Sequence, residues 1–447
     1  MIKDNQNIIK IFSKYFFLLS LFTIFSYFLN LYLNQENFFF YYCDEIVNYK
    51  LNTKNSSFNI NYIFSCDEPK YFYILDNPSL LLSSENYYQQ RPLYILAAIL
   101  LKYLFSSVFL IFDISFALIN QLSFLILQII ILTFQALVLK KILSNVDNIP
   151  ATNNFMISLI IFLNPMNKWS LFQPGHQNMT TLIFFIGVYI LQKKTQVGTY
   201  TPFLIGMLFL FHRSAALLIV SILLRNTLSF QSFKKYFVDL LKVITGFSIP
   251  YLLFRACVYL TGNVLNDNQV AEYNQFTWII DFVSGKETMY SGIMTGWYCQ
   301  KIPQFAICYL IDNSKTILYL SGIFVLLIAL KANQNRDVVS FDEYLPLILN
   351  FLLFYFFWML IGWYPPIRFS FYSIGNLVIV LFAILLFFTK DKNIKNVSII
   401  IYSYYFLFIN HWNAPEILNF SLGNIILISL LIVYLLFKSR DFKIFSK

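Results

Sequence analysis

The stretch ISFALINQLSFLILQIIILTFQALVLKK, residues 114–141, decides the fold class of this chain. It holds no charged residue from Ile114 to Leu139, and two lysines follow at once. An apolar run of about 18 residues or more is long enough to cross a bilayer as a helix. Paired lysines favour the cytoplasmic side, where basic residues accumulate. The segment 114–139 is therefore predicted to be a membrane-spanning helix that runs from outside to inside.

Similar apolar runs recur along the whole chain of 447 residues, of which 58% are hydrophobic and 12% are charged. Soluble globular proteins carry about twice that share of charge. The net charge of +10 is explained by lysines at the cytoplasmic ends of helices, so no nucleic-acid partner is expected. The alternating pattern of an outer-membrane barrel is absent. We predict an all-α polytopic membrane protein in which residues 1–447 form a single transmembrane domain in the lipid bilayer.

About twelve membrane-spanning helices are predicted. Three of them, 153–166, 199–211 and 214–224, are short for a full crossing, so they either extend into their neighbours or are broken or re-entrant inside the protein. The complete set lies near 14–33, 114–139, 153–166, 177–192, 199–211, 214–224, 238–258, 314–330, 344–362, 369–388, 397–410 and 420–437.

The distribution of basic residues predicts the orientation of these spans. With the N-terminus inside, the cytoplasmic segments hold 20 of the 32 lysines and arginines, as cytoplasmic loops commonly do. Two long loops then lie outside, 34–113 and 259–313, whereas every inner loop is short. We expect an integral, multi-pass protein of a bacterial inner (cell) membrane whose active site lies on the outer face.

One segment could reverse this orientation. The sequence LYILAAILLKYLFSSVFLIF, residues 93–112, is long enough to span a bilayer. Counted as a span, it would move Lys140 and Lys141 to the outside. We therefore expect it to lie on the outer membrane surface as an interfacial helix of the first outer loop, with Lys102 snorkelling toward water. A spanning helix is the alternative.

An acidic pair follows the first span. The stretch YYCDEIVNYK, residues 41–50, places Asp44 and Glu45 directly after a run of aromatic residues. A carboxylate pressed against apolar surface tends to have a raised pKa, which suits a general base. A solvated pair in a loop is the alternative.

Arginines at the outer ends of later spans run against the inward bias of basic residues. The stretch FLFHRSAALL places His212 and Arg213 between two spans, GWYPPIRFSFYSIGN places Arg368 between two others, and Arg255 lies at the end of its own span. An arginine near membrane depth usually faces a cavity, a partner or an anionic ligand. One site for an anionic head group, such as a phosphate or pyrophosphate, accounts for all three arginines.

Two further candidates lie on the same predicted side. Arg91 precedes the interfacial helix in QQRPLYILAAIL, where it meets a carboxylate, a lipid phosphate or the aqueous phase. His176 lies in FLNPMNKWSLFQPGHQNMTTLIFF, an outer hairpin with more polar residues than a turn requires.

No metal site is expected from the histidines and cysteines. The chain has 3 histidines and 5 cysteines, with neither a CxxC pair nor a histidine-rich tract. No cofactor is implied, and a divalent-metal requirement is left open. The pairs Cys43–Cys66 and Cys299–Cys308 fall in the two outer loops, where they either form disulfides or serve as apolar fillers.

The order of these motifs resembles the GT-C superfamily of integral membrane glycosyltransferases, which includes protein mannosyltransferases and aminoarabinose lipid A transferases. An acidic motif follows the first span, then come RPLY, a span ending in basic residues, a span ending in NP, FHRSAALL, and PPIRFSFYS before a late span. The resemblance covers residues 10–390.

The resemblance implies transfer of a sugar from a polyprenyl-phosphate carrier on the outer face. Asp44 would activate the acceptor hydroxyl, with Glu45 as its neighbour or substitute. Arg213 and Arg368 match the residues that bind the carrier phosphate best, and Arg255 is a lesser candidate.

On the acceptor side, the resemblance gives Arg91 and His176 a shaping role. The implied partners are a polyprenyl-phosphate-linked sugar donor and a glycan, lipid or protein acceptor. No large soluble domain is present to identify that acceptor.

Two other functions are open. A surface-polysaccharide polymerase also uses outer-face arginines, but its main functional loops usually lie in the later half of the chain. A lipid or solute transporter commonly shows inverted repeats and charges near the membrane midplane, and neither is evident here.

Overall fold

The computed structural model describes residues 2–34, 68–83, 91–111, 116–145, 153–164, 174–193, 200–228, 233–263 and 341–361, together with residues 167, 171, 376, 377, 379, 380 and 383. Within these residues every regular element is a helix and no strand occurs, which confirms the all-α expectation for this part of the chain. The elements are α1 (Ile2–Asn34), α3 (Glu68–Asp76), η2 (Pro78–Leu82), α4 (Pro92–Ile111), α5 (Phe116–Ser144), α6 (Asn154–Leu163), α8 (Asn178–Gln192), α9 (Thr201–Phe211), η4 (Arg213–Ala215), α10 (Ala216–Leu228), α11 (Phe233–Leu260) and α14 (Phe341–Ile361).

Among the residues that the structure describes, three helical segments are long and apolar enough to cross a membrane: Asn7–Ser26 of α1, Ile119–Ser144 of α5 and Tyr236–Leu260 of α11. Helices α6, α9 and α10 are shorter, with 10, 11 and 13 residues. The total of about twelve spans stays a prediction, because 314–330, 397–410, 420–437 and most of 369–388 lie outside the described residues.

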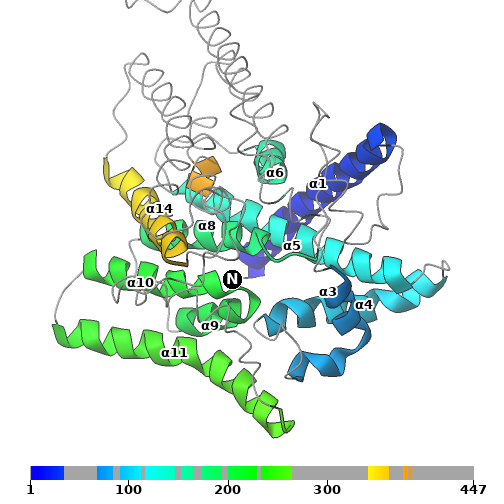
Figure 1. Ribbon diagram of the computed structural model, residues 1–447. Coiled ribbons are helices and arrows are strands. Elements are labelled where there is room, and N and C mark those ends of the chain that lie inside the picture. Colours follow the sequence, from blue (N-terminus) through cyan, green and yellow to red (C-terminus); the bar gives the residue numbers. More distant parts are fainter. Residues whose placement is uncertain are drawn as a thin grey trace, which may run out of the picture.

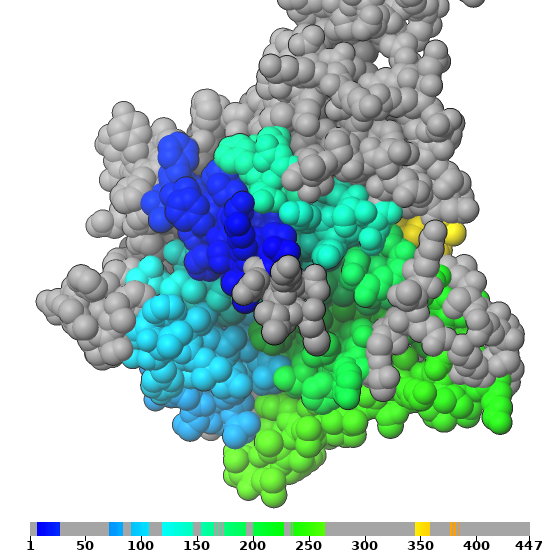
Figure 2. Space-filling model, turned by 180° about the vertical axis from the view of Figure 1, so that it is seen from behind, coloured from blue at the N-terminus to red at the C-terminus, as the bar shows by residue number. Residues whose placement is uncertain are grey.

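Helix α5 lies at the centre of the described part, where it packs against α1, α4, α6 and α8 (Figure 1). In the most apolar stretch of α5, 61% of the residues are buried inside the protein, compared with 17% in α1 and 11% in α11. Figure 2 shows α1, in dark blue, on the surface of the molecule. The two peripheral helices expose apolar side chains such as Phe17 and Leu253, as a lipid-facing helix does.

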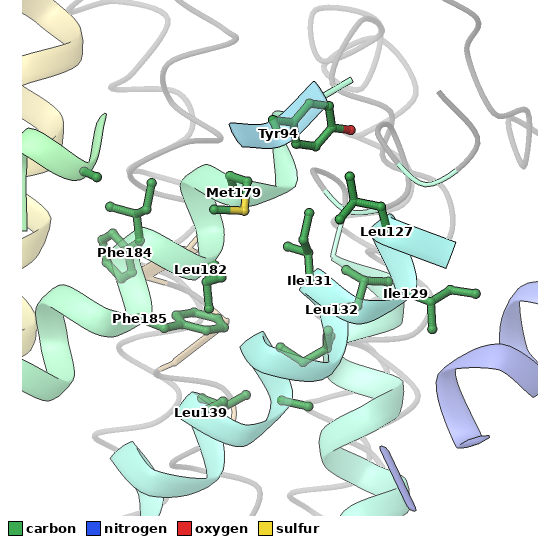
Figure 3. Packing of buried hydrophobic residues seen from close by; sticks show 14 of the residues in the cluster. Tyr94, Leu127, Ile129, Ile131, Leu132, Leu139, Met179, Leu182, Phe184 and Phe185 are labelled. Carbon is green, nitrogen blue, oxygen red and sulfur yellow. The ribbon is translucent and has the colours of Figure 1, made fainter. Parts of the chain in front are cut away.

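The central core lies between α5 and α8. Figure 3 shows Leu182 and Phe185 of α8 facing Ile131 and Leu132 of α5. Phe184 lies on another side of α8, and its ring centroid is 5.1 Å from that of Phe354 in α14. Between membrane helices such contacts act through van der Waals packing, because lipid tails are as apolar as these side chains.

Helices α5, α6 and α8 run in alternating directions. Lys140 Nζ near the end of α5 and the Tyr15 hydroxyl of α1 both donate to Asn154 Oδ1 at the start of α6, at 3.2 and 3.1 Å. Asn145 Nδ2 lies 3.5 Å from Gln192 Oε1, which joins the last residues of α5 and α8. We call this end of the bundle, with Lys140, the lysine end.

Helices α9 and α11 run in the same direction, and α10 connects them. Pro202 packs against Gly246, and Gly206 packs against Pro250, so both contacts advance together along the two helices. Gly206 has no room for a side chain, because a Cβ there would overlap the Phe247 carbonyl oxygen. The three helices follow the predicted order of the spans 199–211, 214–224 and 238–258.

Helix α4 packs against the first part of α5 in the opposite direction, and α3 covers both helices (Figure 1). The ring of Tyr94 stacks on Phe124 at a centroid distance of 5.9 Å. Farther along α4, Lys102 shares Asp76 with Asn120 of α5. Whether α4 lies on the membrane surface or spans it stays a prediction.

The expectation that Lys102 snorkels to water is wrong. Its side chain is 11% exposed, and its ammonium group donates to the Leu75 carbonyl oxygen at 3.1 Å and to Asp76 Oδ1 at 2.6 Å. The end of α3 lies against α4 and supplies both acceptors. An ion pair and a hydrogen bond thus compensate for burial of the charge. The sequence of 93–112 could not predict them, because both partners lie in α3.

Candidate functional site

Five polar residues from four segments of the chain come together at the end of the bundle opposite the lysine end. We call them the histidine cluster: Tyr71, Arg91, His176, His212 and Arg213. The imidazole centroids of His176 and His212 lie 5.0 Å apart. Both histidines are buried, at 9% and 6% exposed. Two rings that are 36 residues apart in the sequence therefore share one interior site.

His212 occupies the junction between α9 and η4. Its backbone N–H donates to the Leu208 carbonyl oxygen at 2.8 Å and ends α9. Its extended backbone, φ −158° and ψ 127°, lets the ring turn back onto the next element. Nδ1 accepts the Ser214 backbone N–H at 3.2 Å and lies 2.7 Å from Ser214 Oγ. The side chain is thus a helix cap, a role more often filled by Ser, Thr, Asp or Asn.

His176 is held by aromatic residues of α3 and α4. Its Nδ1 lies 3.2 Å from the Tyr71 hydroxyl of α3. The Tyr94 ring of α4 meets its imidazole edge-on, at a centroid distance of 6.2 Å. Helices α3 and α4 therefore form the wall of the cluster on this side.

The two arginines flank the histidines. The Arg91 carbonyl oxygen accepts the Tyr94 N–H at 3.2 Å, which places Arg91 at the start of α4. Arg213 directly follows His212 in η4. Burial, together with the positive charges of Arg91 and Arg213, lowers the pKa of His212 well below its usual range. His212 is consequently neutral at pH 7.

A network of amides fixes the loop that carries His176. The Tyr94 hydroxyl donates to the Gly175 carbonyl oxygen at 2.9 Å. Gln128 Nε2 donates to the Tyr94 hydroxyl at 2.8 Å and also bonds Gly175. About two turns further along α5, Gln135 Nε2 donates to the Asn178 carbonyl oxygen at 2.8 Å. Because these groups are buried and mutually bonded, the loop is a rigid support.

The structure brings together three of the residues that the sequence singled out: Arg91, His176 and Arg213. It does not place Arg255 with them. Arg255 lies exposed on α11, where its Nη2 is 3.3 Å from the Tyr259 hydroxyl and its guanidinium lies 5.7 Å from the Tyr259 ring centroid.

Several candidates lie outside the described residues. These are Asp44, Glu45 and Arg368, and the proposed cysteine pairs Cys43–Cys66 and Cys299–Cys308. Their roles stay predictions. The fifth cysteine, Cys257, is a free and exposed thiol on α11.

Sequence reasoning did not assign a role to His212, Tyr71 or Asp76. The stretch HRS could have indicated the cap, because a side chain that accepts the backbone N–H two residues later, as His212 does from Ser214, is a local pattern. Tyr71 gives no such signal in a chain with 31 tyrosines. Asp76 is a carboxylate of the first outer loop that is held by Lys102 and Asn120 rather than by the histidine cluster.

The cluster is suited to binding an anion. Two guanidinium groups and the imidazole and hydroxyl donors beside them match the acceptor oxygens of a phosphate. Among the residues that the structure describes, no group of three or more histidine, cysteine, aspartate or glutamate side chains is placed to hold a metal ion.

No family model, curated protein or solved structure matches this chain. Its function is therefore inferred from the chemistry of the histidine cluster and from the order of the sequence motifs.

Proposed function

We propose that the chain is an integral membrane glycosyltransferase that moves a sugar from a polyprenyl-phosphate carrier to an acceptor on the outer face of a bacterial inner membrane. The observation that carries this proposal is the convergence of Arg91, His176, His212 and Arg213 at one end of the bundle. Two half-buried arginines beside two buried histidines, at the end of apolar helices, suit a phosphate that is attached to a lipid.

The cluster would act on the leaving group. When the bond between the sugar C1 and the phosphate oxygen breaks, negative charge grows on the phosphate. Fixed guanidinium groups at Arg91 and Arg213 stabilise that charge more strongly in a shielded site than in water. Arg368 is proposed as a further phosphate ligand, as the resemblance to GT-C enzymes implies.

The acceptor side requires a base. We assign this role to Asp44, with Glu45 as its neighbour or substitute. The carboxylate takes the proton of the acceptor hydroxyl while the acceptor oxygen forms its bond to C1. Direct attack of this kind inverts the configuration of the sugar carbon. The acceptor is a glycan, a lipid or a protein.

The test is a transfer assay with the full chain in membrane vesicles that are supplied with radiolabelled polyprenyl-phosphate sugars. We expect wild type to transfer label, and Arg213→Ala to lose about 100-fold or more of the rate. Asp44→Asn and Arg368→Ala are expected to lose activity as well. Lys193→Ala, which removes an exposed positive charge at the lysine end, is expected to retain it.

Three results would contradict the proposal. Equal transfer by wild type and Arg213→Ala would remove the phosphate-binding role of the cluster. Extension of a lipid-linked oligosaccharide in place of single-sugar transfer would identify a polymerase. Movement of the labelled lipid across the membrane without cleavage of its sugar–phosphate bond would identify a transporter.

A further inference from the structure

We propose that His212 is a neutral hydrogen-bond donor to the anion in the histidine cluster, with its single ring proton on Nε2. This inference rests on the proposed function, because the anion is the carrier phosphate. It adds a phosphate-binding residue and specifies the protonation state in which that residue binds.

The tautomer follows from the cap geometry. The Ser214 backbone N–H can only donate, and it points at Nδ1 of His212 from 3.2 Å. Nδ1 must therefore present a lone pair, and a neutral imidazole then carries its proton on Nε2. With Nδ1 as an acceptor, the Ser214 hydroxyl, 2.7 Å away, donates to the same nitrogen. A proton on Nδ1 would face the Ser214 N–H directly.

The surrounding charges favour the same neutral form. Arg213 adjoins His212 in η4, and Arg91 approaches from the start of α4; both lower the pKa of His212, after burial as the largest cause. Among the described residues, the other titratable groups at this site are His176 from the loop before α8, which contacts the ring, and Tyr71 of α3 and Tyr94 of α4 behind it. A charged imidazolium would be repelled by the two guanidinium groups and would lose its hydration, so the neutral ring is favoured.

The Nε2 atom of His212 faces α8 and makes only a long contact there. Nε2 lies 3.5 Å from Thr180 Oγ1, which is at the outer limit of a hydrogen bond. A phosphate oxygen between the two arginines would accept this proton in a shorter, charge-assisted bond. The bound phosphate would then receive one neutral donor and two cationic ones.

Histidine labelling tests the tautomer directly. The chain has only 3 histidines, so ¹⁵N-histidine in the purified full chain gives three imidazoles, and the His212→Asn spectrum identifies the one that belongs to His212. We expect the His212 imidazole to be neutral at pH 7, with its proton on Nε2, and to become charged only well below the usual pH range of a histidine. Protonation of this ring between pH 6 and 7, or a proton on Nδ1, would overturn the proposal.

A pair of variants tests the donor role. In His212→Asn the side-chain oxygen can accept the Ser214 N–H in place of Nδ1, so the cap is kept while the Nε2 donor is lost. In His212→Gln the amide N–H reaches the position of Nε2. We expect His212→Asn to bind farnesyl phosphate about 10- to 100-fold more weakly than wild type, since a hydrogen bond to a charged group is lost. His212→Gln is expected to recover most of that affinity.

The two proposals fail in different ways. Wild-type protein that binds no farnesyl phosphate would refute the proposed carrier substrate, and the donor role with it. Wild-type protein that binds farnesyl phosphate, with His212→Asn binding equally well, would refute only the role of His212.

Discussion

At the scale of single residues, Lys102 and Asp76 form an ion pair that joins three helices. Asp76 Oδ1 accepts from Lys102 Nζ at 2.6 Å and from Asn120 Nδ2 at 3.0 Å, so α3, α4 and α5 meet at one carboxylate. Burial alone would raise the pKa of Asp76, but the hydrogen bonds from Lys102 and Asn120 and the lysine charge outweigh it and lower the pKa. The ionised carboxylate is thus part of the folded state.

Replacing Asp76 tests this ion pair. Asp76→Asn is expected to destabilise the protein by about 1–3 kcal/mol at pH 7, because it leaves the Lys102 ammonium buried without its counter-charge. The measurement is thermal unfolding in detergent. The double variant with Lys102→Met should lose less than the sum of the two single variants, since neither charge then lacks a partner. Additive losses would show that the pair contributes no coupling.

The same pair predicts a pH dependence. Because the folded-state pKa of Asp76 is lowered, its stabilising effect is complete above the unfolded pKa of about 4 and is lost as the pH falls through the lower folded value. The difference in stability between wild type and Asp76→Asn should therefore shrink in acid.

At the scale of elements, α8 and α14 come into close contact at Gly187 of α8. Asn350 Nδ2 of α14 donates to the Phe184 carbonyl oxygen of α8 at 2.9 Å. A Cβ on Gly187 would overlap Asn350 Oδ1. The glycine lets the two helices approach, as small residues do in membrane helix pairs, and the amide then bonds the backbone of the other helix.

Gly187→Ala is therefore expected to displace the Asn350 side chain and to lower the unfolding free energy by about 1–3 kcal/mol, because the buried amide loses its acceptor. The loss is expected to be much smaller when Asn350→Ala is already present, since the overlap is then gone. Comparison of melting temperatures for the two backgrounds gives the result. An equal loss in both backgrounds would assign the effect to α8 itself.

At the scale of the whole molecule, the described helices have two chemically different ends. The lysine end gathers Lys140 with the start of α6 and the last residues of α8. The histidine cluster occupies the opposite end, where α9 ends and α8 begins. Helix α8 separates the two by about 22 Å, for 15 residues at 1.5 Å each. The placement of the lysine end inside and of the histidine cluster outside stays a prediction.

Cysteine labelling checks that orientation. In a variant whose 5 native cysteines are replaced by serine, we expect Asn263→Cys to react with an impermeant maleimide applied to intact cells. Lys193→Cys should react only after the membrane is permeabilised, because the lysine end is predicted to face the cytoplasm. The reverse pattern would mean that 93–112 spans the membrane or that the chain begins outside.

The sequence by itself determined where the long helices of the described part lie, because composition and periodicity act locally; the short helix α3 was not predicted. Segment 177–192 coincides with α8 to within one residue, and 238–258 lies within α11. The first span was placed at 14–33, whereas α1 begins at Ile2, because polar residues near the N-terminus interrupt the apolar run but not the helix. Arg91, His176 and Arg213 could also be identified locally, since charged or polar groups beside apolar runs require a partner.

Only the tertiary structure decided which of these groups share a site. The contact between Tyr71 and His176 joins residues 105 positions apart, and the burial of Lys102 depends on a carbonyl and a carboxylate from α3. No local pattern encodes either contact, because each follows from how α3, α4, α5 and α8 pack together. The physical reason is that hydropathy specifies the depth of a residue along a helix, whereas its neighbours on the other helices are set by side-chain packing and by the pairing of buried polar groups.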